Sequence, residues 1–145
     1  MSLQRRWPLG LMAAAVATLV LQGCSSTKTD DSCGTAREMV NYNKTQTEAI
    51  AAKSDPATGT DAGVADYQQW ADQLKNYAGK ISGAQGAHAQ KVADLAGQTV
   101  TLVQQARSNN SDPLVAQPPE WVQKYSDTQI QFQRELSALK DSCPT

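Results

Sequence analysis

The spacing of apolar residues between positions 61 and 83 constrains the fold of this 145-residue chain most strongly. Apolar residues recur there in steps of three and four, which places their side chains on one face of an α-helix. Trp70 and Tyr77 lie on one flank of that face and widen it. Asp61 is placed to cap the helix, and Gly83 suits a left-handed position beyond its end. The face consists of Val64, Tyr67, Ala71, Leu74, Ala78 and Ile81.

Three further segments carry the same spacing and predict helices over about 36–53, 87–108 and 119–143. Thr35 and Glu38 have the form of a capping box before the first of them. Gly97 lies inside the helix predicted over 87–108, where it costs about 1 kcal/mol relative to alanine unless close packing requires it. We call the residues at this spacing on one face of a helix its stripe. The stripe of the first helix includes Asn43, Thr47 and Ile50. The stripe of the last helix includes Val122, Tyr125, Gln129, Phe132, Leu136, Leu139 and Cys143.

The first 23 residues have the three-part pattern of a secretory signal peptide. Arg5 and Arg6 provide the positive charge, residues 9–21 form an apolar run, and the small Gly23 precedes Cys24. The run falls short of the ~20 residues that cross a bilayer as a helix. Cleavage is therefore expected rather than retention as a membrane span, which is the alternative.

Residues 21–24, Leu-Gln-Gly-Cys, resemble the lipobox of bacterial lipoproteins, although Gln22 stands where small or apolar residues are usual. The resemblance implies cleavage before Cys24, a diacylglycerol on its sulfur, and acyl chains such as palmitate that anchor the protein. Together with the Ala- and Gln-rich composition, the motif resembles small lipoproteins of high-GC actinobacteria, including mycobacteria. Residues 24–32 would then be a lipidated flexible tether and residues 33–145 the folded domain.

The location implied by this resemblance is the cell membrane, on the side facing away from the cytoplasm. If the source has an outer membrane, Ser25 after Cys24 resembles the signal that permits transfer there. Two cysteines remain in such an oxidising compartment, Cys33 and Cys143, and the default expectation is that they pair.

Four helices with fairly short links predict an all-α, up-down four-helix bundle, with a three-helix domain bearing a long hairpin as the alternative. In the bundle, the start of the first helix and the end of the fourth lie at the same end. A disulfide between Cys33 and Cys143 would close that end.

Composition and motifs argue against several classes of function. The mature chain carries eleven basic and fourteen acidic residues, a weakly acidic balance that gives no reason to bind nucleic acid. The one histidine, His88, is expected to be a capping or surface residue rather than a metal ligand or acid–base group. Motifs for haem attachment, serine nucleophiles and phosphate loops are absent. We therefore expect no enzyme activity, no cofactor and no metal.

The sequence favours a protein-interaction or structural module that contacts another envelope protein. Small residues at Ala71, Ala78, Ala96 and Gly97 support this choice, because they let helices approach closely and leave little internal space. An exposed apolar patch on an outer face would accompany such a role.

The alternative is a carrier or sensor of a small apolar ligand held between the helices. Its contacts would come from Trp70 and Tyr77 or from an opening near Trp121, although plain core packing is the commoner role of such aromatic residues. This alternative requires a cavity of at least ~300 Å³.

Overall fold

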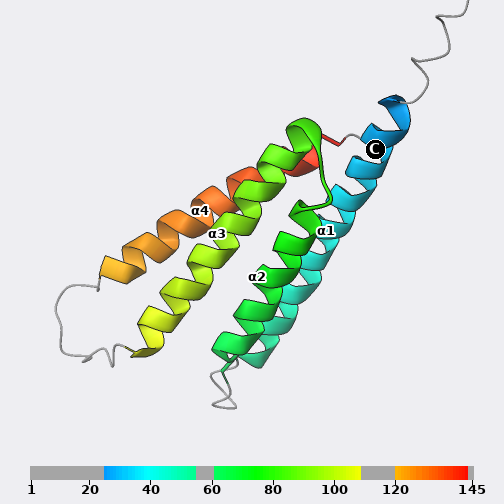
Figure 1. Cartoon of the computed structure of the whole chain (residues 1–145). Coiled ribbons are helices and arrows are strands. Elements are labelled where there is room, and N and C mark those ends of the chain that lie inside the picture. Colours follow the sequence, from blue (N-terminus) through cyan, green and yellow to red (C-terminus); the bar gives the residue numbers. More distant parts are fainter. Residues whose placement is uncertain (1–24, 55–60, 109–119, 144–145) are drawn as a thin grey trace, which may run out of the picture.

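The computed structural model describes residues 25–54, 61–108 and 120–143, and their side chains from Asp31 onward. The elements are α1 (Ser25–Lys53), α2 (Val64–Ala78), α3 (Gly83–Ser108) and α4 (Glu120–Asp141). Successive helices run in opposite directions, and α3 lies between α2 and α4 (Figure 1). The predicted four-helix bundle is confirmed.

A disulfide joins Cys33 on α1 to Cys143 just beyond α4, with their Cα atoms 5.3 Å apart. Figure 1 shows the chain leaving the end of α4 toward the first part of α1. The predicted bridge between the start of the first helix and the C-terminus is therefore confirmed. It closes a loop of 110 residues.

The core is made by the faces that the apolar spacing predicts. On α2, the residues Ala71, Leu74 and Ala78 are buried. Trp70, expected on a flank, is buried as well, with only 3% of its surface exposed. The largest side chains with almost no exposure are Phe132, Met39, Leu74, Leu139, Val92 and Thr99.

The first helix begins earlier than the sequence predicts. It starts at Ser25 rather than near Ala36, so residues 25–32 are helical where a flexible tether was expected. The Thr35 hydroxyl donates a hydrogen bond to the Asp31 carbonyl 3.0 Å away, within the helix, so the capping box does not form. Once packing has nucleated a helix, each further residue gains a backbone hydrogen bond for the conformational entropy of that residue alone. The helix therefore extends toward the N-terminus past the expected start at Thr35.

The buried face of α4 departs from the predicted stripe toward its N-terminal end. Val122 is 36% exposed, whereas Thr128, outside the stripe, is buried. Steps of three and four average 3.5 residues per turn, so a straight helix drifts from them by ~20° per heptad. A pattern with that spacing therefore turns away from the buried face that Phe132 and Leu139 mark, and Val122 lies outside the core.

The links around α2 differ in detail from the prediction. Gly63 precedes α2, and its N–H donates to the Asp66 carboxylate at 2.8 Å. Asp61, expected as the cap, instead pairs with Arg107 at the end of α3. Gly83 has a φ of +72°, which confirms the predicted left-handed conformation, and α3 begins at that residue.

Candidate functional site

A pocket of about 320 Å³ opens between α1 and α4, toward the end of the bundle that lies away from the disulfide. Near the disulfide, Ala36 and Leu139 are fully buried in the core. Farther along, small side chains such as Ala51 leave space between the two helices. All four helices contribute to the wall, which consists of Thr47, Ile50, Ala51, Ser54, Tyr67, Trp70, Thr99, Tyr125, Gln129, Phe132 and Gln133.

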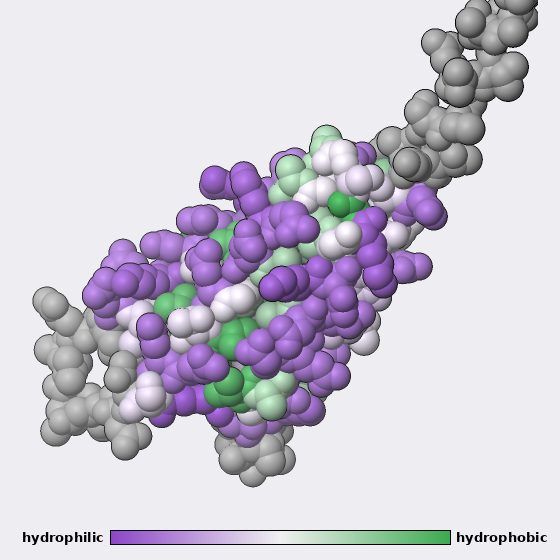
Figure 2. Space-filling view, viewed as in Figure 1, coloured by the Kyte–Doolittle hydropathy of each residue, from purple (hydrophilic) through white to green (hydrophobic). Residues whose placement is uncertain are grey.

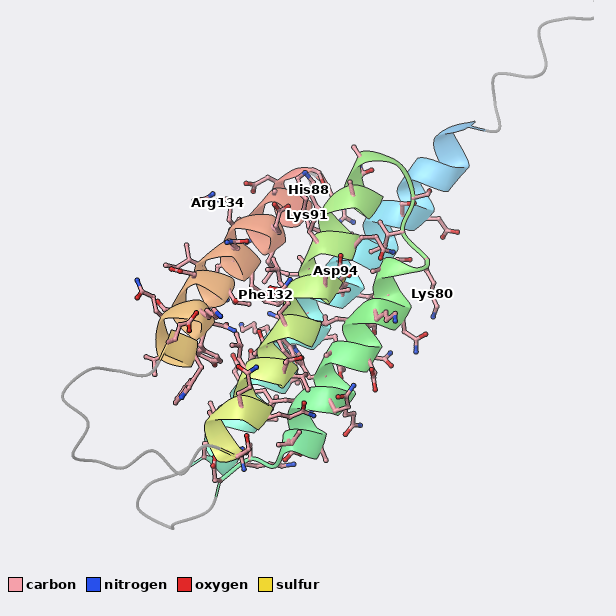
Figure 3. All side chains as sticks on the ribbon, turned by 60° about the vertical axis from the view of Figure 1, so that its left-hand side comes forward. Lys80, His88, Lys91, Asp94, Phe132 and Arg134 are labelled. Carbon is pink, nitrogen blue, oxygen red and sulfur yellow. A yellow bond between two sulfur atoms is a disulfide. The ribbon has the colours of Figure 1, made fainter. Side chains whose placement is uncertain are left out.

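Two buried aromatic rings of the core lie behind this wall, since Trp70 is 3% and Phe132 1% exposed. The rings of Trp70 and Phe132 are tilted against each other, with their centroids 5.4 Å apart. The indole N–H of Trp70 donates to Oδ1 of Asn43 at 3.0 Å, which fixes the orientation of the ring. Figure 3 shows Phe132 between the ribbons of α4 and α3. The two rings therefore form a fixed floor to the pocket, and the side chains around them provide its accessible surface.

The polar positions of the predicted stripes meet at the same pocket. Nε2 of Gln129 donates to Oγ1 of Thr99 at 3.0 Å, and the Thr99 hydroxyl donates to the Leu95 carbonyl at 2.9 Å. The Thr47 hydroxyl donates to the Asn43 carbonyl at 2.8 Å. The hydrogen bond between Gln129 and Thr99 links α4 to α3, whereas the bonds from Thr47 and Thr99 to backbone carbonyls lie within their own helices. All three side chains line the pocket.

Two tyrosines complete the wall, Tyr67 from α2 and Tyr125 from α4. Within the described part of the chain, neither hydroxyl has a hydrogen-bond partner. Burial raises the pKa of both phenols, and the proximity of Tyr125 raises that of Tyr67 further. Both groups therefore stay neutral at physiological pH and can donate hydrogen bonds into the pocket.

Among the residues that the structure describes, no charged side chain lines the pocket. Ser54, on the wall, donates a hydrogen bond to Oδ1 of Asp61 at 3.2 Å. The other Asp61 oxygen is 2.9 Å from Nη2 of Arg107, so this charge is already paired. The described wall can supply contact with the tyrosine side chains and neutral hydrogen bonds.

Of the three aromatic residues that the sequence singled out, the structure places only Trp70 in the pocket. Tyr77 lies on another flank, with its ring centroid 5.7 Å from that of Tyr42, whose pKa is raised by burial and by this neighbour. Trp121 is half-buried outside the pocket wall, and its indole N–H has no partner among the described residues. Cys24, the predicted lipidation site, lies outside the described residues.

The sequence did not reveal that His88 has a carboxylate partner. Nδ1 of His88 lies 2.7 Å from Oε2 of Glu135, and Nζ of Lys91 lies 3.4 Å from Oε1. The hydrogen bond from His88 is the main cause that lowers the pKa of Glu135, and Lys91 adds to it. Figure 3 shows His88 and Lys91 in the first part of α3, beside α4. Because 47 residues separate His88 from Glu135, only the fold could bring them together.

Residues able to hold a metal do not gather in the described ranges, where no three His, Cys, Asp or Glu side chains form a group. The cluster of His88, Glu135 and Lys91 is instead an ion-pair link between α3 and α4.

The described surface carries few large exposed apolar residues. They are Val122 and Ile130, which stand eight positions apart on α4. The face seen in Figure 2 is mostly hydrophilic, and its hydrophobic residues show in small separate areas. Gly97 also lies at the surface, where an added Cβ would meet no atom within 4 Å. The expectation that it serves close helix approach is therefore wrong.

Comparisons with protein-family models, curated proteins and solved structures found no match for this chain. None of the described helices combines the length and apolar character needed to span a membrane.

Proposed function

We propose that this protein is a membrane-anchored carrier or sensor that binds a small uncharged ligand in the pocket beside Trp70. The observation that carries the proposal is the convergence of side chains from all four helices, among them Tyr67, Tyr125 and Gln129, on one open pocket of about 320 Å³, a volume that suits a small molecule.

The composition of the wall supports the same proposal. Ligand sites combine an apolar surface with a few polar groups that orient the ligand. Here the half-buried rings of Tyr67 and Tyr125 provide apolar contact, and their hydroxyls together with Gln129 carry the polar groups. The non-enzymatic role expected from the sequence fits the described part of this wall, which contains no ionisable side chain apart from the two phenols.

The membrane anchor in this proposal is the lipid on Cys24. Intact-mass measurement of the membrane fraction should find a chain that begins at Cys24 and carries acyl groups. Replacement of that residue in Cys24→Ala should leave an unprocessed precursor. An unmodified protein cleaved elsewhere would remove the anchor from the proposal without affecting the pocket.

The deciding experiment is native mass spectrometry of the protein purified from its own host, together with organic extraction and a cross-linking pull-down. We expect one small neutral molecule per chain, and its loss in Ala51→Trp, which adds a large side chain to the pocket wall. Ala52→Trp is the matched control and should keep the ligand, because Ala52 is exposed like Ala51 but does not line the pocket. A stoichiometric envelope protein with no small molecule would instead support the interaction module.

A further inference from the structure

We propose that the contact between Tyr42 on α1 and Tyr77 on α2 is an oxidative modification site, at which a carbon–carbon bond joins the two phenol rings. The product is a dityrosine that ties α1 to α2 within one chain. Neither residue lines the pocket beside Trp70, so this site does not depend on the proposed function.

The contact between the two rings is the first observation. Their centroids lie 5.7 Å apart, and the ring planes are tilted by 47°. Both side chains pack against the hydrophobic core, which holds them side by side. Reacting groups that are held together couple faster than groups that must meet by diffusion, because their translational freedom is already lost. Bond formation then requires only a rotation of the side chains that brings together one ortho carbon of each ring.

The second observation is that both rings reach the surface. Tyr42 and Tyr77 are half-buried, so an oxidant dissolved in water can approach them. The other ring contact in the described part of the chain joins Trp70 and Phe132, and both of those side chains are almost fully buried. Contact and access therefore coincide at the tyrosine pair.

The contact also distinguishes this pair from the other two of the four tyrosines. Burial and, next, the proximity of Tyr125 raise the pKa of Tyr67, so these two phenols are near enough to interact. Among the described residues, however, no ring contact joins them. Coupling is therefore expected at Tyr42 and Tyr77 rather than at Tyr67 and Tyr125.

The reaction removes two electrons and two protons in total. Each phenol loses one electron and its hydroxyl proton and becomes a phenoxyl radical. The two radicals form the new bond between ortho carbons, and the proton on each of these carbons moves to the oxygen of its own ring, which restores both phenols. The oxidant is hydrogen peroxide acting through a peroxidase, and one peroxide molecule takes up the two electrons and two protons to give two water molecules.

The disulfide between Cys33 and Cys143 is compatible with exposure to such an oxidant, because disulfides persist mainly in oxidising compartments. The two covalent links would also act on different contacts of α1. The disulfide joins α1 to the end of the chain, and the dityrosine would join α1 to α2.

Treatment of the full mature chain with a haem peroxidase and hydrogen peroxide tests the proposal. Trypsin cleaves after lysine and arginine, so each of the four tyrosines lies on its own peptide. We expect a monomeric product that has lost two hydrogen atoms and has the fluorescence of dityrosine. Mass spectrometry should find the peptide of residues 38–44 joined to that of residues 76–80.

Tyr77→Phe keeps the ring but removes its phenol, so it should abolish this product. Tyr125→Phe is the matched control and should leave the product unchanged, and a thermal melt would check that both variants are folded. The proposal would be overturned by the absence of dityrosine in the wild type, or by coupling only between chains or between Tyr67 and Tyr125. An unchanged yield of the monomeric product in Tyr77→Phe would overturn it as well.

Discussion

The buried contact between Asn43 and Trp70 shows how one polar residue can specify the arrangement of two helices. Asn43 is 5% exposed, and its side-chain oxygen accepts the only N–H of the indole. Another register of α1 on α2 would leave both groups buried without partners, which is costly. A polar residue in an otherwise apolar stripe thus selects one pairing.

Asn43→Ala should lower the free energy of unfolding by about 1–3 kcal/mol, because the buried indole N–H of Trp70 would lose its partner. Urea unfolding followed by circular dichroism measures this change. Asn41→Ala is the matched control, since Asn41 is exposed on the same helix and gains the same helix propensity. Equal effects of the two substitutions would show that the hydrogen bond contributes nothing.

Two helical glycines of α3 should respond in opposite ways to alanine. Gly97→Ala should raise the free energy of unfolding by about 1 kcal/mol, because the new methyl meets no atom and the helix gains propensity. Gly86→Ala should lower it by about 1–3 kcal/mol, because the Cβ would lie 2.7 Å from the Ile81 carbonyl oxygen. Thermal melts of both variants test the pair, and a destabilised Gly97→Ala would contradict the open surface at that site.

At the scale of the helix, α3 and α4 are linked by Glu135, which contacts His88 and Lys91. The pKa of Glu135 is lowered in the folded protein, chiefly by the hydrogen bond with His88. A carboxyl group with a lowered pKa stabilises the fold above its unfolded pKa of about 4.3, and this contribution is lost as the pH falls through the folded value.

Comparison of the wild type with Glu135→Gln should reveal this contribution. The wild type should be more stable at pH 6 by less than about 1 kcal/mol, as is usual for ion pairs near the surface. The difference should shrink as the pH falls below about 4.3. Urea unfolding at a series of pH values measures it, and a difference that is constant down to pH 2 would contradict the assigned link.

The helices themselves could be predicted from the sequence because their apolar spacing is local. α2 follows the predicted stripe, and Gly83 adopts the predicted conformation at the turn. The start of α1 and the rotation of α4 could not be predicted in this way. The first depends on helix propagation from packed residues, and the second on a drift that accumulates along α4 away from its buried residues Phe132 and Leu139.

The candidate site was only partly predictable for a related reason. Trp70 stood out as an aromatic residue beside the α2 stripe, and Thr47 and Gln129 were polar members of the stripes predicted for the first and last helices. Tyr67 and Tyr125 had been placed on the stripes as core residues. Their meeting at a pocket depends on the separation of α1 from α4, which the spacing within single helices does not determine.

At the scale of the whole molecule, the disulfide between Cys33 and Cys143 joins positions 110 residues apart and so connects the two ends of the folded domain. Reduction, or Cys33→Ser/Cys143→Ser, should lower the free energy of unfolding by a few kcal/mol, with about 4–5 kcal/mol as the value from loop entropy. Chemical unfolding with and without reductant measures this change. Two alkylatable thiols in the freshly isolated protein would contradict the bridge.

If the proposed lipid on Cys24 anchors the protein, the early start of α1 has a geometric consequence. Thr47, on the pocket wall, stands 22 residues after Ser25 on one helix, a distance of roughly 33 Å. Lipid-embedded quenchers can measure the depth of a fluorophore at Ala52 in liposomes, and a broad distribution of depths would argue against a stiff connection. With a stiff connection, the height of the pocket above the bilayer depends on the tilt of α1 relative to the bilayer normal and not on the flexibility of a linker. The tilt of this helix would then determine whether the proposed ligand enters from the bilayer surface or from the aqueous space beyond it.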